Sequence, residues 1–123
     1  MEFASIRIIT DDLDGMVAFY ERVTGSFARR PAPVFAEVVT GGAVLALGTP
    51  ATVAALGAGA PTAGGNGSVI VEFLVDDVDA TFEGLREGLD DVLLPPTTMP
   101  WGNRSTLFRD PDGNLVNLFS RPA

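Results

Sequence analysis

Two charged side chains interrupt otherwise apolar segments of this chain and are its first candidates for chemistry. Arg7 lies within S-I-R-I-I, residues 5–9, and Glu72 lies within I-V-E-F-L, residues 70–74. Strand side chains alternate between two faces, so each charged residue takes one face while its apolar neighbours take the other, which suits packing against a helix. A charge on the remaining face is costly unless it is paired, solvated or used on a ligand. Glu72 is therefore a candidate acceptor for a cationic or amide-bearing ligand, and Arg7 a candidate donor to a carboxylate or carbonyl.

Arg7 and Glu72 could also have roles that involve no ligand recognition. They could form a mutual or solvent-exposed ion pair of little energetic value. Burial could instead raise the pKa of Glu72 and make it a general base.

Composition excludes several classes of chemistry. The chain of 123 residues has no histidine or cysteine, and all eight of its basic residues are arginine. It therefore offers no imidazole base, no thiol nucleophile and no lysine for a Schiff base. A net charge of −8 argues against nucleic-acid binding and fits a basic ligand, although acidity also aids solubility. The start of the sequence has no basic region followed by a long apolar run, so we expect a cytoplasmic protein with no membrane segment.

An internal repeat organises the sequence. Residues 5–14 parallel residues 70–79, and residues 38–47 parallel residues 109–118. Each half reads as strand, helix and three strands. We expect one domain, with repeat one at about 1–48, a connector at about 49–67 and repeat two at about 68–123.

The helix of each repeat has a start signal and an apolar period. Asp12 and Asp77 are predicted N-caps, and Gly25 suits the exit of the first helix. The apolar positions with helical spacing are Leu13, Met16, Val17, Tyr20 and Val23 in the first half, and Val78, Phe82, Leu85 and Leu89 in the second. Both helices should cover the outer face of a sheet.

The remaining segments carry weaker signals. The second strand of each repeat is predicted at Phe27–Arg30 and at Val92–Leu94. Residues 90–103 have a loop composition that includes two consecutive prolines, and the Ala/Gly/Pro-rich residues 48–67 are expected to hold one helical turn around residues 52–56. The predicted architecture is α+β, with two βαβββ repeats forming a curved mixed sheet around a cavity. A ferredoxin-like α+β sandwich is the alternative.

Three motifs resemble those of the vicinal oxygen chelate superfamily, which includes glyoxalase I, extradiol dioxygenases, fosfomycin-resistance enzymes and bleomycin-resistance proteins. They are D-L-D-G-M-V-A-F-Y-E-R-V-T-G, V-D-D-V-D and W-G-N-R-S-T-L-F-R-D-P-D-G-N-L. Metal-dependent relatives take their ligands from the first and fourth strands of each repeat. Those positions here are Ser5, Ala46, Ile70 and Asn117, which do not make a divalent-metal donor set. We therefore predict no catalytic metal and no cofactor.

The sequence L-F-R-D-P-D-G-N-L-V-N-L, residues 107–118, is predicted to form a hairpin of two strands and a tight turn that closes the second repeat. The resemblance implies that one side of this closing hairpin lines the cavity. Together with Arg7, Glu72, Ser5 and Asn117, the candidate ligand-binding residues are Trp101, Asn103, Ser105, Leu107 and Arg109. Trp101 could stack on a planar ligand, or serve as a lid or dimer-interface residue. Asp110, Asp112, Gly113 and Asn114 are expected to form the hairpin turn rather than a catalytic cluster.

The resemblance is nearest to the metal-free bleomycin-resistance-like members. It implies a binding protein that sequesters an antibiotic or another planar or cationic natural product, with no nucleic-acid or membrane partner, as a homodimer. One alternative is a metal-free isomerase, epimerase or lyase in which Glu72 accepts a proton and Arg7 or Arg109 stabilises an oxyanion. Another is a non-catalytic partner domain with a vestigial cavity.

Overall fold

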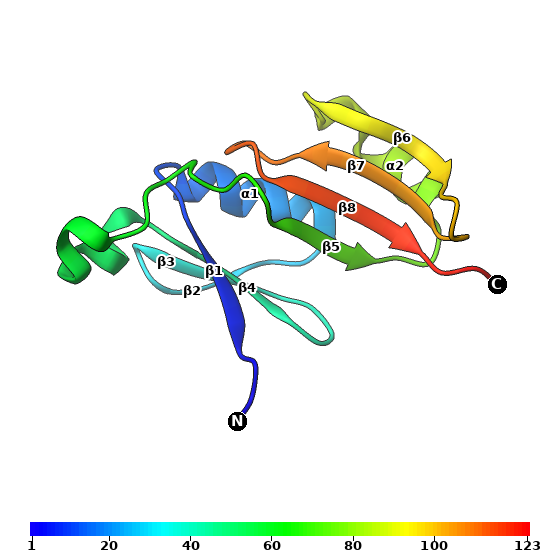
Figure 1. Ribbon diagram of the computed structural model, residues 1–123. Coiled ribbons are helices and arrows are strands. Elements are labelled where there is room, and N and C mark those ends of the chain that lie inside the picture. Colours follow the sequence, from blue (N-terminus) through cyan, green and yellow to red (C-terminus); the bar gives the residue numbers. More distant parts are fainter. The chain divides into compact units, whose positions relative to one another are not determined.

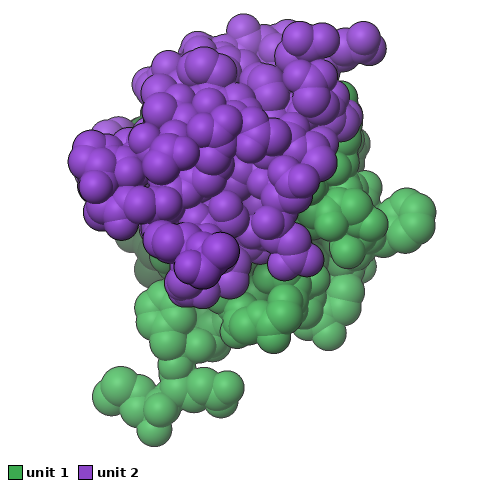
Figure 2. Space-filling model, turned by 90° about the vertical axis from the view of Figure 1, so that its right-hand side faces the viewer, with its two compact units in different colours: residues 1–66 green, residues 67–123 purple.

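The computed structural model describes residues 1–123 and contains two compact units, Met1–Asn66 and Gly67–Ala123 (Figure 2). Unit 1 contains β1 (Ser5–Ile9), α1 (Leu13–Thr24), β2 (Arg29–Ala32), β3 (Phe35–Val39), β4 (Val44–Gly48) and the 3-10 segment η1 (Pro50–Gly59). Unit 2 contains β5 (Ile70–Leu74), α2 (Val78–Leu85), the 3-10 segment η2 (Arg86–Gly88), β6 (Val92–Thr98), β7 (Arg104–Arg109) and β8 (Leu115–Ser120). This order confirms an α+β protein with two βαβββ repeats, not a ferredoxin-like sandwich.

The sheet of unit 1 has the strand order β1-β4-β3-β2, in which β1 runs parallel to β4 and the other pairs are antiparallel. Ala36 pairs with Leu47 and Val38 with Leu45, and all four residues are buried. Helix α1 packs on β3 and β4. Partners in register share a face, so this buried side is the helix-covered face.

The sheet of unit 2 repeats that plan as β5-β8-β7-β6 (Figure 1). Phe108 pairs with Val116 and Thr106 with Leu118, and these residues are almost fully buried on the side where α2 packs against β6, β7 and β8. The side opposite the helix, in either unit, is called the reverse face below.

Both helices begin at the predicted caps. The Asp12 carboxylate accepts a hydrogen bond from the Gly15 N–H at 3.0 Å, and that of Asp77 accepts one from the Ala80 N–H at 3.0 Å. Gly25 ends α1 with φ of 70°, a left-handed conformation that glycine adopts without a Cβ penalty.

The structure corrects the predicted second strands. Strand β2 begins at Arg29 rather than Phe27, and β6 extends to Thr98 through residues predicted as loop. Because β6 is an edge strand, one of Pro95 and Pro96 can direct its missing N–H to the open side without loss of a ladder bond, and the irregular pairing at this point accommodates the other. The pairing of β6 with β7 shifts register between Leu94 and Thr97, at these prolines.

The connector is also more regular than predicted. Helical structure covers Pro50–Gly59 instead of a single turn, with a break at Gly57, whose φ is 67°. No helix in the protein combines the length and the apolar character needed to cross a membrane.

Candidate functional site

Glu72 and Asn117 lie side by side on the reverse face of unit 2. They are partners in the parallel pairing of β5 with β8, and Asn117 Nδ2 donates a 2.8 Å hydrogen bond to Glu72 Oε2. Residues 71 and 73 pair with Val116 and Leu118 of the helix-covered side, so alternation places Glu72 on the opposite face. The predicted face of Glu72 is thus confirmed within this unit.

The carboxamide oxygen of Asn117 has no hydrogen-bond partner. This Oδ1 atom is covered from solvent, while the Nδ2 atom of the same group is used on Glu72. A covered polar atom without a partner costs free energy, and such sites in native proteins often await a ligand or an ordered water. The pair therefore presents the Glu72 carboxylate as an exposed hydrogen-bond acceptor, oriented by Asn117, with the covered Asn117 Oδ1 beside it.

Apolar side chains surround this polar pair. Ile70 and Leu74, on either side of Glu72 along β5, are 46% and 56% exposed. Leu107 pairs with Asn117 across β7 and β8, and Phe119 lies two residues along β8 from Asn117. The predicted site residues did not include Leu74 and Phe119, although the two-residue period that places Glu72 and Asn117 on this face places them there as well.

The other hairpin candidates have different environments. Ser105 is buried opposite Phe119, on the same face as Leu107. Arg109 is already engaged, because its Nε lies 3.3 Å from Asp91 Oδ2 and its Nη1 donates to the Gly113 carbonyl at 2.9 Å. Arg109 therefore holds the hairpin turn to the start of β6.

Trp101 and Asn103 belong to the turn between β6 and β7. Trp101 is 68% exposed, and the Asn103 carbonyl accepts a 2.7 Å hydrogen bond from the Met99 N–H. Leu107, in register with Asn117, is six positions beyond Trp101. At about 3.4 Å per strand residue, these six positions span up to about 20 Å, so Trp101 lies well away along the chain from Leu107 and from the Glu72–Asn117 pair.

Arg104 lies on the helix-covered face of β7, because it shares that face with the buried Thr106 and Phe108. Its Nε and Nη2 donate to the two carboxylate oxygens of Asp79, in the first turn of α2, at 2.9 and 2.8 Å. These hydrogen bonds hold the pKa of Asp79 below its ordinary value and raise the pKa of Arg104. This bidentate pair is an anchor between strand and helix.

Arg7 and Ser5 lie on the reverse face of unit 1. Arg7 pairs with Ala46 on β4, and Ala46 pairs with Glu37 on β3. Ser5 occupies the exposed start of β1, opposite Val44. Glu37 is held by Arg29 at 3.3 Å, so it is not available as a close partner for Arg7.

The family's metal positions do not provide a metal site. Ser5 and Ala46 lie on β1 and β4, and Ile70 and Asn117 on β5 and β8, as the resemblance implies. They supply a hydroxyl and a carboxamide but no carboxylate, imidazole or thiolate. No group of three or more Asp, Glu, His or Cys side chains is arranged to hold a metal. The residues present do not fit the divalent ion of the metal-dependent relatives.

The hairpin turn has the structural role predicted for it. Asp110 is 5% exposed, and its carboxylate accepts hydrogen bonds from the backbone N–H groups of Asp112 and Asn114 and from Asn114 Nδ2. Gly113 takes a φ of 85°. The carboxylate thus organises the turn.

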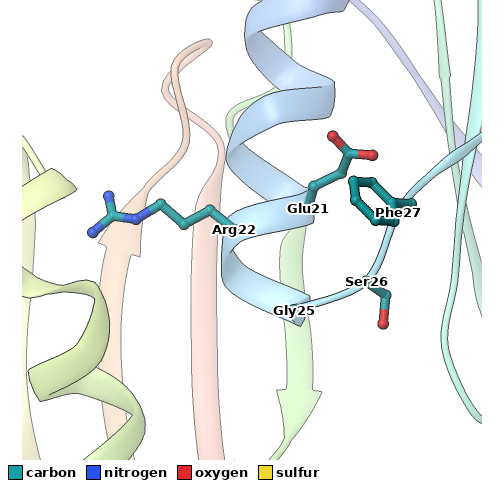
Figure 3. A pocket seen from close by; sticks show the side chains of 5 residues that line it. All are labelled: Glu21, Arg22, Gly25, Ser26 and Phe27. Atoms are coloured by element: carbon teal, nitrogen blue, oxygen red, sulfur yellow. The ribbon is translucent and has the colours of Figure 1, made fainter.

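A hollow of about 260 Å³ lies where α1 ends (Figure 3). It is lined by Glu21, Arg22, Gly25, Ser26 and Phe27. Figure 3 shows Glu21 on the Phe27 side and Arg22 extending away, and the Glu21 carboxylate accepts a 2.8 Å hydrogen bond from the Ala28 N–H. This shallow hollow contains none of the residues predicted for binding.

Comparisons with known proteins agree with this architecture. The family model described as "Glyoxalase/Bleomycin resistance protein/Dioxygenase superfamily" matches residues 2–118. A curated relative, the uncharacterized protein YraH of Bacillus subtilis (strain 168), is 37% identical over 51 residues. That match spans 41% of this chain and 40% of YraH, well under half of either protein.

Solved structures match along almost the entire chain. A glyoxalase/bleomycin resistance protein/dioxygenase from Nocardioides is 26% identical with a TM-score of 0.77, covering 99% of this chain and 84% of that one. A glyoxalase/bleomycin resistance protein/dioxygenase family enzyme from Burkholderia phytofirmans PsJN is 18% identical with a TM-score of 0.83, covering 98% of both chains. At the latter identity the likeness concerns the fold alone.

Proposed function

Because this chain belongs to the glyoxalase/bleomycin resistance protein/dioxygenase superfamily, we propose that it is a metal-independent binding protein for a small molecule with N–H donors on an apolar body. The observation that carries the proposal is the acceptor pair formed by Glu72 and Asn117, in which Asn117 orients the exposed Glu72 carboxylate. A carboxylate and a carboxamide oxygen both accept hydrogen bonds, so the complementary ligand group is an amine, amidine or amide.

The surroundings favour an amphipathic ligand. Ile70, Leu74, Leu107 and Phe119 flank the acceptors with exposed or half-buried apolar surface. Binding sites for small molecules typically combine a mostly apolar lining with a few convergent polar groups. A planar cationic natural product, such as an antibiotic, has both features, and sequestration of such a compound is the role we assign to the protein.

Binding fits the side chains better than catalysis does. The sequence has no histidine, cysteine or lysine, and Arg109 is already used by Asp91 and Gly113. An oxyanion-stabilising role for Arg109 would require it to leave both partners.

The test is a thermal-shift screen followed by calorimetry. A ligand that binds the folded state raises the free energy of unfolding by RT ln(1 + [L]/Kd), so binding appears as a higher melting temperature. The screen compares aromatic amines, amidines and amides, which carry N–H donors, with the matching aromatic carboxylates, which do not. We expect the donor-bearing compounds to stabilise the protein. For a cationic hit, Glu72→Gln should weaken binding by about tenfold or more, since hydrogen bonds to charged groups contribute about 1.5 to 3 kcal/mol.

Glu83→Gln is the matched control. It removes the same charge from an exposed ion pair on α2 with Arg86, away from the acceptor pair. Equal weakening by Glu72→Gln and Glu83→Gln would show only an effect of net charge and would contradict the proposal.

Trp101 allows a separate measurement because it is the sole tryptophan. If the ligand stacks on it, binding quenches its fluorescence and Trp101→Ala weakens affinity by about 1 to 3 kcal/mol. Binding with neither effect would remove Trp101 from the site and leave the acceptor pair intact.

A further inference from the structure

Asn66 is followed by glycine at the point where the first unit ends and the second begins. An asparagine can lose its side-chain amide when the backbone nitrogen of the next residue attacks its Cγ, and glycine has no side chain to hinder that approach. The other three asparagines of the chain precede bulkier residues, namely Arg104, Leu115 and Leu118. Asn66 is therefore the asparagine with the least steric protection against this reaction.

Aspartate before glycine undergoes a related ring closure, and the chain has two such steps, Asp14–Gly15 and Asp112–Gly113. Both hold the glycine nitrogen in a hydrogen bond. The first glycine N–H donates to the Asp12 carboxylate at 3.0 Å, and the second donates to the Asp110 carbonyl at 2.9 Å. A nitrogen held in this way reaches the neighbouring Cγ only after its hydrogen bond breaks, which costs free energy.

The glycine that follows Asn66 is not held. No hydrogen bond of the structure involves the Gly67 N–H. Both residues are exposed and belong to neither a helix nor a strand. A Cβ added to Gly67 would meet no atom within 4 Å beyond its chain neighbours, so the space around this nitrogen is open. Asn66 itself makes an interaction, but it does so in an exposed loop, where local opening costs little free energy.

We propose that Asn66 is a site of spontaneous deamidation in the folded protein. The deprotonated Gly67 nitrogen attacks the Asn66 Cγ, a new C–N bond closes a succinimide ring, and the Cγ–Nδ2 bond breaks to release ammonia. The proton that the backbone nitrogen loses is balanced by the one that ammonia takes up. Water then adds to one of the two ring carbonyls and opens the ring. The products are aspartate and isoaspartate, and water is the sole co-reactant.

The modification changes the linkage between the two units. Either product adds one negative charge to a chain whose net charge is already −8. Isoaspartate also inserts the side-chain methylene into the backbone, shortly before β5 begins at Ile70. Both changes fall outside the two sheets, so each unit should keep its strand pairing. This chemistry is independent of the proposed ligand binding.

The experiment follows the full-length protein near neutral pH, both folded and unfolded in guanidinium chloride. Cleavage after arginine isolates Asn66, because no other asparagine and no glutamine lies between Arg30 and Arg86. Mass spectrometry, against a sample that was not incubated, should show loss of the Asn66 amide at similar rates in both states. Electron-transfer fragmentation separates isoaspartate from aspartate. Asp112, whose glycine nitrogen is bonded, should form isoaspartate faster in the unfolded protein than in the folded one.

Gly67→Ala tests the mechanism. The φ of Gly67 is not positive and its Cβ would meet no neighbour, so the variant should fold. The added methyl group hinders the attack, and loss of the amide should slow severalfold. Gly59→Ala makes the same change elsewhere in the connector, also in open space, and should leave the rate unchanged. Retention of the Asn66 amide in the folded protein would overturn the proposal, as would a Gly67→Ala variant that reacts at the wild-type rate.

Discussion

Asn117 Nδ2 donates a 2.8 Å hydrogen bond to Glu72 Oε2, joining β8 to β5 across the parallel edge of the second sheet. The two residues are 45 positions apart in sequence, and their carboxylate and carboxamide are direct cross-strand neighbours. The pair leaves one covered acceptor, Asn117 Oδ1, without a partner. This relationship turns two separate sequence candidates into one local site.

Asn117→Asp should destabilise the protein at neutral pH. The substitution replaces the donor to Glu72 with a second carboxylate, and like charges directly opposite each other on neighbouring strands cost roughly 0.2 to 1 kcal/mol. The midpoint of urea unfolding should fall at pH 7 and recover toward the wild-type value when acid protonates the carboxylates. Asn117→Ser, which adds no charge, is the control, and an equal loss in both variants at every pH would contradict this mechanism.

The Asp79–Arg104 pair should contribute stability that depends on pH. Because hydrogen bonding to Arg104 lowers the pKa of Asp79 from 3.8, the contribution is present above pH 3.8 and is lost as pH falls through the lower folded-state pKa. The melting temperatures of wild-type protein and of the Asp79→Asn variant should therefore differ at pH 7 and converge in acid. A double-mutant cycle with Arg104→Gln isolates the pair, and a coupling of zero at pH 7 would contradict the assignment.

Asp110→Ala should be among the more destabilising single substitutions. It removes a buried acceptor and leaves the N–H groups of Asp112 and Asn114 unpaired, at a cost of about 2 kcal/mol or more. Denaturant unfolding measures the change. Asp112→Ala retains the backbone donor at the same turn, and Asp112 Oδ2 has no partner, so this control should cost clearly less. Equal losses would mean that the turn does not depend on the Asp110 carboxylate.

Divalent metals should not stabilise the protein. Ser5, Ala46, Ile70 and Asn117 lack the donors that Ni²⁺, Zn²⁺, Mn²⁺ or Mg²⁺ require. Each ion should leave the melting temperature unchanged, and elemental analysis of purified protein should find substoichiometric metal. A stoichiometric ion whose binding is lost on Asn117→Leu would show that the family's metal positions remain functional here.

We expect a homodimer in solution. Strands β1 and β5 are the end strands of their own sheets and carry exposed apolar side chains, with Ile6, Ile70 and Leu74 between 46% and 56% exposed. Exposed apolar surface on an end strand favours association with another chain. Light scattering should give twice the mass of the chain. Leu74→Lys should shift the equilibrium toward monomer, whereas a wild-type monomer at all concentrations would refute the expectation.

Local chemistry in the sequence determined much of the fold. Three features depend only on residues within a few positions of each other. They are the Asp12 and Asp77 caps, the apolar period of both helices and the turn around Asp110. Such features can be predicted from the sequence without knowledge of the tertiary structure. Alternation likewise placed Glu72 opposite the helix, because the two-residue period of a strand is a property of its own backbone.

Tertiary structure decided what alternation leaves open. A face assignment does not say which strands are neighbours, so only the pairing of β5 with β8 shows that Asn117 reaches Glu72. The extension of β6 through Pro95 and Pro96 follows from its place at the sheet edge, which no local signal shows. Arg109 looked available for a ligand and is instead taken by Asp91, while Arg7 is left without a carboxylate. Such pairings between distant residues are selected by the burial of apolar faces across the whole sheet, and they decide which of the chain's charged groups remain free to bind.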